Sequence, residues 1–144
     1  MKRHEAIAPL SRDHHGSLIL AQLLKLNAPP YPGMPDNVKD KALYAQQQFE
    51  THIKKHFLQE EIMLKKAKDT HPSIKNLTQE IKAEHKQLSA LFQSLATAGD
   101  LENKMNVLAT TLEKHIRKEE RVLFPLLQQH CSEALLQQIY ELLH

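Results

Sequence analysis

Apolar residues recur every three or four positions through most of this 144-residue chain, and four short breaks interrupt the pattern. The first break, from Ala28 to Asn37, contains four prolines, which lack the amide donor that a helix needs. The others, at 68–73, 97–100 and 130–132, contain residues that end or cap helices, such as glycine, aspartate and serine. This spacing places apolar side chains on one face of an α-helix. We therefore expect helices at 9–27, 36–68, 73–98, 101–129 and 132–143.

The first four expected helices are long, and their connections are short. Long amphipathic helices joined in this way pack side by side in alternating directions. Aromatic residues make up only 5% of the chain, whereas sheet proteins favour aromatic and β-branched residues. The sequence therefore predicts an all-α protein, an up-down-up-down antiparallel four-helix bundle with a short extra C-terminal helix. Its length predicts one domain over residues 1–144.

The charge pattern and the chain start exclude several classes of protein. The formal net charge is +2 and acids and bases are mixed, so no basic stripe predicts nucleic-acid binding. No apolar stretch approaches the roughly 18 residues of a membrane span, and the first residues lack the apolar core of a secretory signal. Cys131 is the only cysteine, which excludes a disulfide framework and a cysteine-based zinc site. We expect a cytoplasmic protein, and the sequence leaves its oligomeric state open.

Polar residues interrupt each long apolar stripe near its middle. A histidine followed four residues later by a glutamate occurs twice, and the second copy lies 59 positions after the first. In helix 101–129 this pair falls on a stripe that continues with Val122. The midpoints of antiparallel helices meet at one level, so the interruptions should converge inside the bundle. They are His14, His56, Glu60, His85, His115 and Glu119.

Burial of these imidazoles and carboxylates costs free energy unless they bind something. Imidazole and carboxylate together suit iron, zinc or manganese. Residues four apart share a helix face, so Glu60 and Glu119 could bridge two metal ions while the histidines bind one ion each. A single buried histidine is usually a hydrogen-bonded core residue, and a single pair of this kind usually lies on the surface. Four helices with matching interruptions favour a metal site.

Two further histidines are weaker candidates. His14 and His15 cannot both face inward, and the stripe through His14 is the more apolar. His52 lies one turn before His56 and could be a metal ligand, a hydrogen-bond donor to a ligand or a residue that lines a channel. The histidines in termini and breaks should be solvated: His4, His71, His130 and His144.

Several acids stand beside the candidate ligands in the sequence. Glu61 and Glu120 fall one step off the inward stripes, and we expect both on the surface. Glu84 precedes His85 and is also expected on the surface, with a hydrogen bond to a metal ligand as the alternative.

Four stretches resemble the hemerythrin-like family, in the version named for its His-His-Glu cation-binding motif. They lie within roughly residues 7–127 and read R-D-H-H, H-F-L-Q-E-E-I-M-L, A-E-H-K-Q-L and H-I-R-K-E-E-R-V-L-F-P. The resemblance implies two iron ions in a non-haem di-iron centre within a four-helix bundle. By the same resemblance, His14 would share one iron with His115 and His56 would share the other with His85. Glu60 and Glu119 would bridge the irons.

The chain departs from the oxygen-carrying members of that family in two ways. Carriers have a second histidine one turn from the first on the third helix, where this chain has Ile81 and Ser89. They also have an aspartate five residues after the fourth-helix histidine, where this chain has Glu119 at four. Fewer histidines leave open metal positions, which favour reactivity, sensing or metal exchange over reversible carriage. His52 could fill the fifth place.

We therefore expect a di-iron protein that binds or senses a small diatomic ligand, oxygen or nitric oxide, or iron itself. A di-iron enzyme with peroxidase, oxidase or nitric-oxide-reducing activity is the first alternative, although no catalytic residue is visible outside the metal ligands. A zinc-bound or metal-free helical interaction module is the second. Zinc or manganese could replace iron. Ferritin-like carboxylate proteins need Glu-x-x-His on two helices, and only Glu141 with His144 fits that spacing.

Overall fold

The computed structural model describes residues 2–97 and 99–144. The described residues form helices and no strands, which confirms the all-α prediction. The chain runs through α1 (Ala8–Leu24), α2 (Val38–Gln48), the wide π-helical turn η1 (Phe49–Ile53), α3 (Lys54–Ala67), the 3-10 turn η2 (Lys68–Thr70), α4 (Pro72–Ser94), α5 (Leu101–Lys118), a second π-helical turn η3 (Glu119–Leu123), α6 (Phe124–His130) and α7 (Glu133–Leu143).

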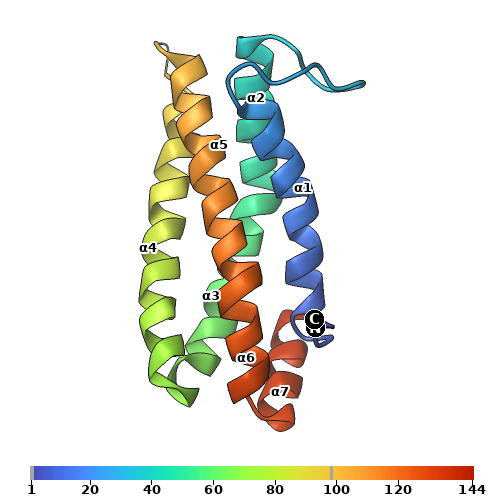
Figure 1. Ribbon diagram of the computed structural model, residues 1–144, viewed down its shortest axis with the longest axis vertical. Helices are drawn as coiled ribbons and strands as arrows, with labels where there is room; N and C mark the ends of the chain where they lie inside the picture. Colours follow the sequence, from blue (N-terminus) through green and yellow to red (C-terminus); the bar gives the residue numbers. More distant parts are fainter. Residues whose placement is uncertain (1, 98) are drawn as a thin grey trace.

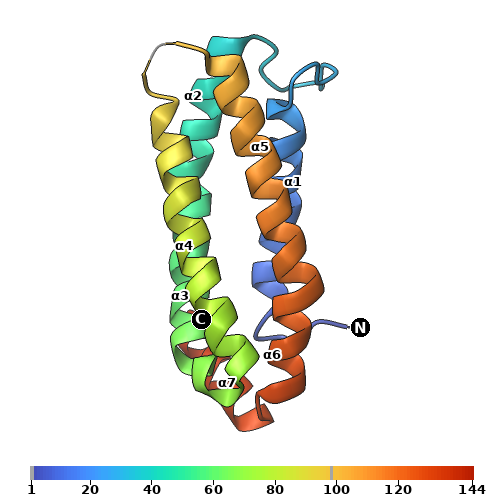
Figure 2. The ribbon, with the colours of Figure 1, turned by 60° about the vertical axis from the view of Figure 1, so that its left-hand side comes forward.

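The helices form a bundle whose longest axis follows four long helical segments (Figures 1 and 2). We call these segments the four rods: α1, α2–α3, α4 and α5–α6. The short α7 lies at one end, where it contacts α3. Among the described residues, no helix is both long and apolar enough to cross a membrane.

The helix starts follow from local hydrogen bonds. The side chains of Asn37 and Ser132 accept the amides of Asp40 and Leu135, as N-caps do. Asp100 lacks such a bond and has a positive φ of 53°. α4 ends at Ser94, and the predicted end of this helix at residue 98 lies outside the described residues.

The apolar core is divided into two clusters by the polar layer that the sequence predicts. One cluster, around Phe92 and Leu108, lies toward the end of the bundle that carries the proline-rich loop between α1 and α2. The other, around Leu64 and Phe124, joins α3, α6 and α7. Apolar packing at both ends holds the four rods together, so the polar side chains between them have fixed positions.

Two wide turns change which residues face inward. In each turn a backbone amide donates to the carbonyl five residues earlier, from Lys54 to Phe49 and from Phe124 to Glu119. The extra residue rotates the helix that follows. Val122, expected inside, is therefore 44% exposed, and Leu123 takes its place in the core with 0% exposure.

Candidate metal centre

All six side chains that interrupt the apolar stripes meet in the polar layer between the two apolar clusters. They come from four separate rods, and each is at most 7% exposed: His14, His56, Glu60, His85, His115 and Glu119. The weaker candidates lie outside this group, because both His15 and His52 are exposed. For His52 the reason is the η1 turn, which places Ile53 in the core instead.

The two glutamates lie at the centre of the cluster with no exposed surface. Glu60 approaches His85 Nε2 through Oε1 (3.0 Å) and His56 Nε2 through Oε2 (3.2 Å). Glu119 approaches His14 Nε2 through Oε1 (2.9 Å) and His115 Nε2 through Oε2 (3.4 Å). Each carboxylate therefore faces two imidazoles, one on either side.

The ligand atoms divide into two groups that share both glutamates. In each group, one atom per residue lies within 4.8 Å of all the others. One group adds His14 and His56, whose ring centroids are 5.0 Å apart, and the other adds His85 and His115 at 5.1 Å. The pairing implied by the family resemblance, in which His14 shares an ion with His115, is therefore wrong. His14 instead converges with His56 on the same oxygen, Oε2 of Glu60 (3.8 and 3.2 Å).

The Nδ1–H group of each of the four imidazoles, which points away from the cluster, donates a hydrogen bond to a second carboxylate. Asp13 is exposed, whereas Glu61, Glu84 and Glu120 are half-buried. Glu61 and Glu120 were expected on the surface, but their carboxylates bond to histidines of the cluster. For Glu84 the alternative expectation, a bond to a ligand, is the one observed. The four Nδ1 contacts are His14 to Glu120 (2.6 Å), His56 to Asp13 (3.0 Å), His85 to Glu61 (2.8 Å) and His115 to Glu84 (2.6 Å).

These outer acids stand at matching positions in the sequence, and only the contact of Glu84 was among the expectations. An acid directly precedes the histidine in α1 and α4, as in Asp13–His14, and directly follows the glutamate in the other two rods, as in Glu60–Glu61. Each acid bonds to the histidine of a different helix. Such bonds fix the ring orientation and make the inner nitrogen a better ligand.

Further contacts hold the site from outside. Phe57 stacks on His85 with ring centroids 4.1 Å apart, and Phe124 stacks on His14 at 5.6 Å. Arg3 donates to the carboxylate of Glu120 (3.2 Å) and to its carbonyl. In a π-helical turn, the carbonyl of Glu120 would accept from the amide five residues later. That residue is Pro125, which has no N–H, so Arg3 donates to this carbonyl instead.

Burial and mutual charge shift the acid–base properties of the cluster. Burial by itself lowers the pKa of His14, but hydrogen bonds to Glu119 and Glu120 outweigh it and raise the pKa to about 9. Burial also acts to lower the pKa of His56, but the charge of Glu60 outweighs burial and raises this pKa to about 10. Burial, together with the charge of Glu60, raises the pKa of Glu119 to about 7. Burial also disfavours the charge of Glu60, yet its contacts with His56 and His85 hold its pKa well below the usual value.

The cluster fits a cation, because several of its inward atoms have no hydrogen-bond partner. Among the described residues, the buried side-chain atoms without one are Nε2 of His56 and His115 and Oε2 of Glu60 and Glu119. A buried polar atom without a partner costs on the order of 1–3 kcal/mol. All four belong to the two candidate ligand groups. Metal ions between these atoms would remove that cost.

Replacement of an outer acid tests whether these contacts tune metal binding. We expect Glu84→Gln to weaken metal affinity about 10–100-fold, because a neutral amide beside Nδ1 makes the Nε2 of His115 a less basic metal ligand. Glu80→Gln is the matched control, since Glu80 lies one turn away and pairs only with Lys118 among the ion pairs described (3.1 Å). Competition with a chelator measures both affinities, and equal values for the two variants would contradict the role assigned to Glu84.

Comparison with known proteins agrees with this geometry. Neither a curated protein nor a solved structure matches the chain. Residues 5–127 match a family model described as the hemerythrin HHE cation binding domain, and this range contains all six inward-facing side chains. Because the match covers most of the chain, the protein belongs to the hemerythrin HHE cation-binding domain family.

Proposed function

We propose that the protein binds two iron ions in a non-haem di-iron centre and uses them to bind or sense a small diatomic ligand, oxygen or nitric oxide, or iron itself. The observation that carries the proposal is the set of buried nitrogen and oxygen atoms that face one another without forming a hydrogen bond. One ion would be held by His14 and His56 and the other by His85 and His115. Glu60 and Glu119 would bridge them. When bound, iron would supply the capacity to take up a diatomic molecule at an open position.

The ligand set supports iron without excluding other divalent ions. Four imidazoles and two carboxylates suit iron, zinc or manganese, whereas soft ions prefer sulfur. The one thiol, that of Cys131, is buried in the apolar cluster around Leu64. The resemblance to the hemerythrin family favours iron among these three ions.

We further propose that residues 1–144 form one domain in which the four rods run up-down-up-down, and that the protein works in the cytoplasm. Short connections support the alternating order. All four rods contribute to one buried cluster, which supports a single domain.

Metal analysis of anaerobically purified protein tests the function. We expect two irons per chain and an absorption spectrum that changes on addition of air or nitric oxide, because open positions would accept the ligand. Less than one iron per chain would contradict the proposal, and a spectrum that neither gas alters would contradict the binding of a diatomic ligand. Steady-state turnover of peroxide or nitric oxide that is lost in Glu60→Ala would identify a di-iron enzyme instead. Full stability after exhaustive chelation would identify an interaction module.

A further inference from the structure

A groove with a volume of about 520 Å³ lies between α3 and α4. It adjoins the metal-binding cluster only through Glu61, whose carboxylate bonds to Nδ1 of His85 (2.8 Å). We call it the α3–α4 groove. Its large apolar side chains and its bases are Leu58, Ile62, Lys65, Lys68, Lys75 and Lys82.

The α3–α4 groove carries a positive charge that the described residues leave unpaired. Four lysines stand against one acid, Glu61, so the groove has an excess of three positive charges, more than the +2 of the whole chain. In the part of the chain that the structure describes, none of these four lysines forms an ion pair. Lys25, Lys54 and Lys118, in contrast, each pair with a glutamate.

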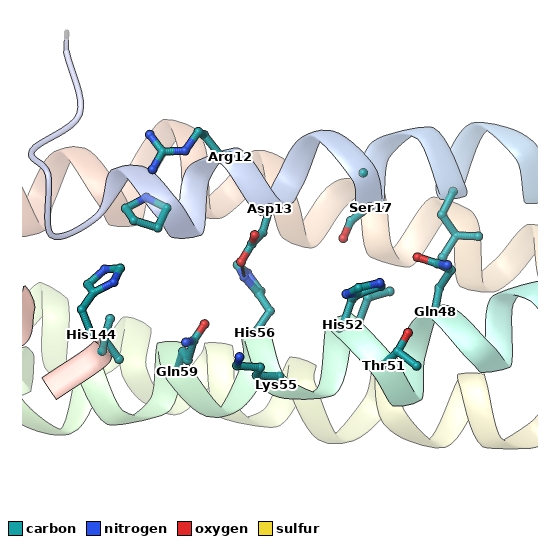
Figure 3. A pocket seen from close by; sticks show the side chains of 15 residues that line it. Arg12, Asp13, Ser17, Gln48, Thr51, His52, Lys55, His56, Gln59 and His144 are labelled. Atoms are coloured by element: carbon teal, nitrogen blue, oxygen red, sulfur yellow. Dashed lines mark hydrogen bonds and ion pairs between the residues drawn. The ribbon is translucent and has the colours of Figure 1, made fainter.

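The other openings on the bundle surface are less positive. Figure 3 shows one of about 760 Å³ between α1 and the η1–α3 rod, where Asp13 offsets one of the two charges of Arg12 and Lys55. The opening of about 400 Å³ between α4 and α5 has two lysines and one glutamate among its described lining residues. The attraction for a negatively charged partner is therefore greatest at the α3–α4 groove.

The same groove contains two exposed apolar side chains. Leu58 and Ile62 are 58% and 45% exposed, and they stand four residues apart on one face of α3. A single exposed leucine is normal in a soluble protein, but apolar positions one turn apart within a groove are what an amphipathic helix needs for docking. The pair precedes Lys65 and Lys68 in the chain, so the groove is basic toward the η2 turn and apolar away from it.

The size and composition of the groove fit a short helix better than a nucleic acid or a membrane. The lining residues span 58–65 on α3 and 75–82 on α4, and seven steps along an α-helix cover about 10 Å, or two turns. The described lining residues include neither an aromatic ring nor an arginine, the side chains that stack on nucleic-acid bases. A recessed apolar pair between two helices is less suited to a bilayer than the protruding face of a surface helix.

We propose that the α3–α4 groove is a docking surface for an acidic amphipathic helix of a partner protein. The apolar side chains of the partner would cover Leu58 and Ile62, and its carboxylates would pair with Lys65, Lys68 and Lys75. Burial of the apolar pair supplies affinity, and the complementary charges set the orientation of the helix and speed the encounter. None of these residues is a candidate metal ligand, so the docking surface goes beyond the proposed di-iron function and is tested separately from it.

A synthetic peptide tests the docking surface. The probe is an alanine-based helical peptide of about 14 residues, or about four turns, with two leucines four residues apart followed by several glutamates. Isothermal titration calorimetry at low salt should show saturable binding to the purified protein. Peptides with serine in place of leucine, or lysine in place of glutamate, should bind at least about 10-fold more weakly. Equal affinity for all three peptides, or no binding up to about 1 mM, would overturn the proposal.

Charge reversal in the groove tests the role of the lysines. Lys65→Glu combined with Lys75→Glu should weaken peptide binding at least about 10-fold at low salt, because attraction becomes repulsion. Lys55→Glu combined with Lys114→Glu is the matched control, since it changes the net charge equally at residues that line other openings. The control should stay within about 3-fold of wild type. An equal loss in both double variants would show that net charge alone attracts the peptide.

Replacement of an exposed leucine tests the apolar contact. Leu58→Gln should weaken peptide binding about 10-fold, because the buried area of a leucine is lost. Leu43→Gln is the matched control, since Leu43 lies on α2, outside the groove, and is 56% exposed. Both variants should melt close to wild type, because each site is exposed. Equal peptide affinity in Leu58→Gln and Leu43→Gln would contradict the docking of an apolar face on α3.

Other occupants of the groove would give different results. A single-stranded oligonucleotide or vesicles of anionic phospholipid could bind more tightly than the peptide and lose this binding in the Lys65→Glu, Lys75→Glu variant. That result would assign the groove to a nucleic acid or a membrane and overturn the proposal. Self-association in sedimentation experiments that the same variant abolishes would assign the groove to a second copy of the chain instead.

Discussion

Replacement of Glu119 by leucine should prevent the chain from binding two metal ions while its helices stay folded. Glu119 has no exposed surface and approaches His14 of one ligand group and His115 of the other (2.9 and 3.4 Å). Leucine cannot bridge the groups. It also removes a buried carboxyl whose pKa is raised to about 7 by burial and by the charge of Glu60. Removal of one partner of a buried ion pair costs about 3–5 kcal/mol when the other charge is left unpaired, but Glu60 also lies 3.8 Å from His14 Nε2 and still faces that imidazole, so the helices should stay folded.

Metal content per chain and urea unfolding of the metal-free protein measure both parts of this prediction. Glu113→Leu is the matched control, because Glu113 is a buried glutamate of the same rod that pairs with Lys25 (2.6 Å) and lies outside both ligand groups. The control should keep two ions and lose stability. Two ions per chain in Glu119→Leu would show that Glu119 is not a bridge.

The stability of the metal-free protein should decrease by several kcal/mol, as an order of magnitude, between pH 6 and pH 10. The folded-state pKa values of His14 and His56, about 9 and 10, lie above the unfolded value of 6.5. Their stabilisation is therefore complete below pH 6.5 and is lost as the pH rises through 9 and 10. Glu119 adds to the loss, because its raised pKa of about 7 means that folding favours its protonated form.

Glu60 has the opposite effect at low pH. Its pKa lies well below the usual value, so its stabilisation is present above pH 4.5 and is lost as the pH falls further. Urea unfolding at several pH values should therefore show maximum stability in the weakly acidic range. Metal ions replace the protons on the imidazoles, so the loaded protein should keep its stability at pH 9 and should release protons when metal is added. A flat profile from pH 6 to pH 10 without metal would contradict the charge state assigned to His14 and His56.

The helical periodicity was sufficient to predict the features that depend on a single helix. In α4 the predicted stripe, with His85 between Ile81 and Leu88, is buried throughout. The errors arise where the backbone departs from the α-helix. The positions of Val122 and His52 depend on the wide turns η3 and η1, and an apolar pattern does not show such a turn.

The features of the site that the sequence did not predict depend on how neighbouring helices are rotated. Asp13 bonds to His56 of another helix, and the pattern of α1 alone does not place that contact. The grouping of His14 with His56 also depends on how the helices are rotated. Every rod contributes an inward histidine or His–Glu pair at nearly the same level, so the sequence alone does not show which histidines lie together. The repeated acids beside His14, His85, Glu60 and Glu119 were the one signal in the sequence that could have indicated the outer contacts.

The division of the apolar core has a consequence for how the molecule opens. The cluster around Phe92 and the cluster around Leu64 are separated by a layer whose side chains repel or attract one another according to their protonation. Without metal, we therefore expect the two ends to exchange their amide hydrogens by independent local unfolding. Ions held by the residues of the middle layer would connect all four rods at one level, and exchange at the two ends should then become coupled.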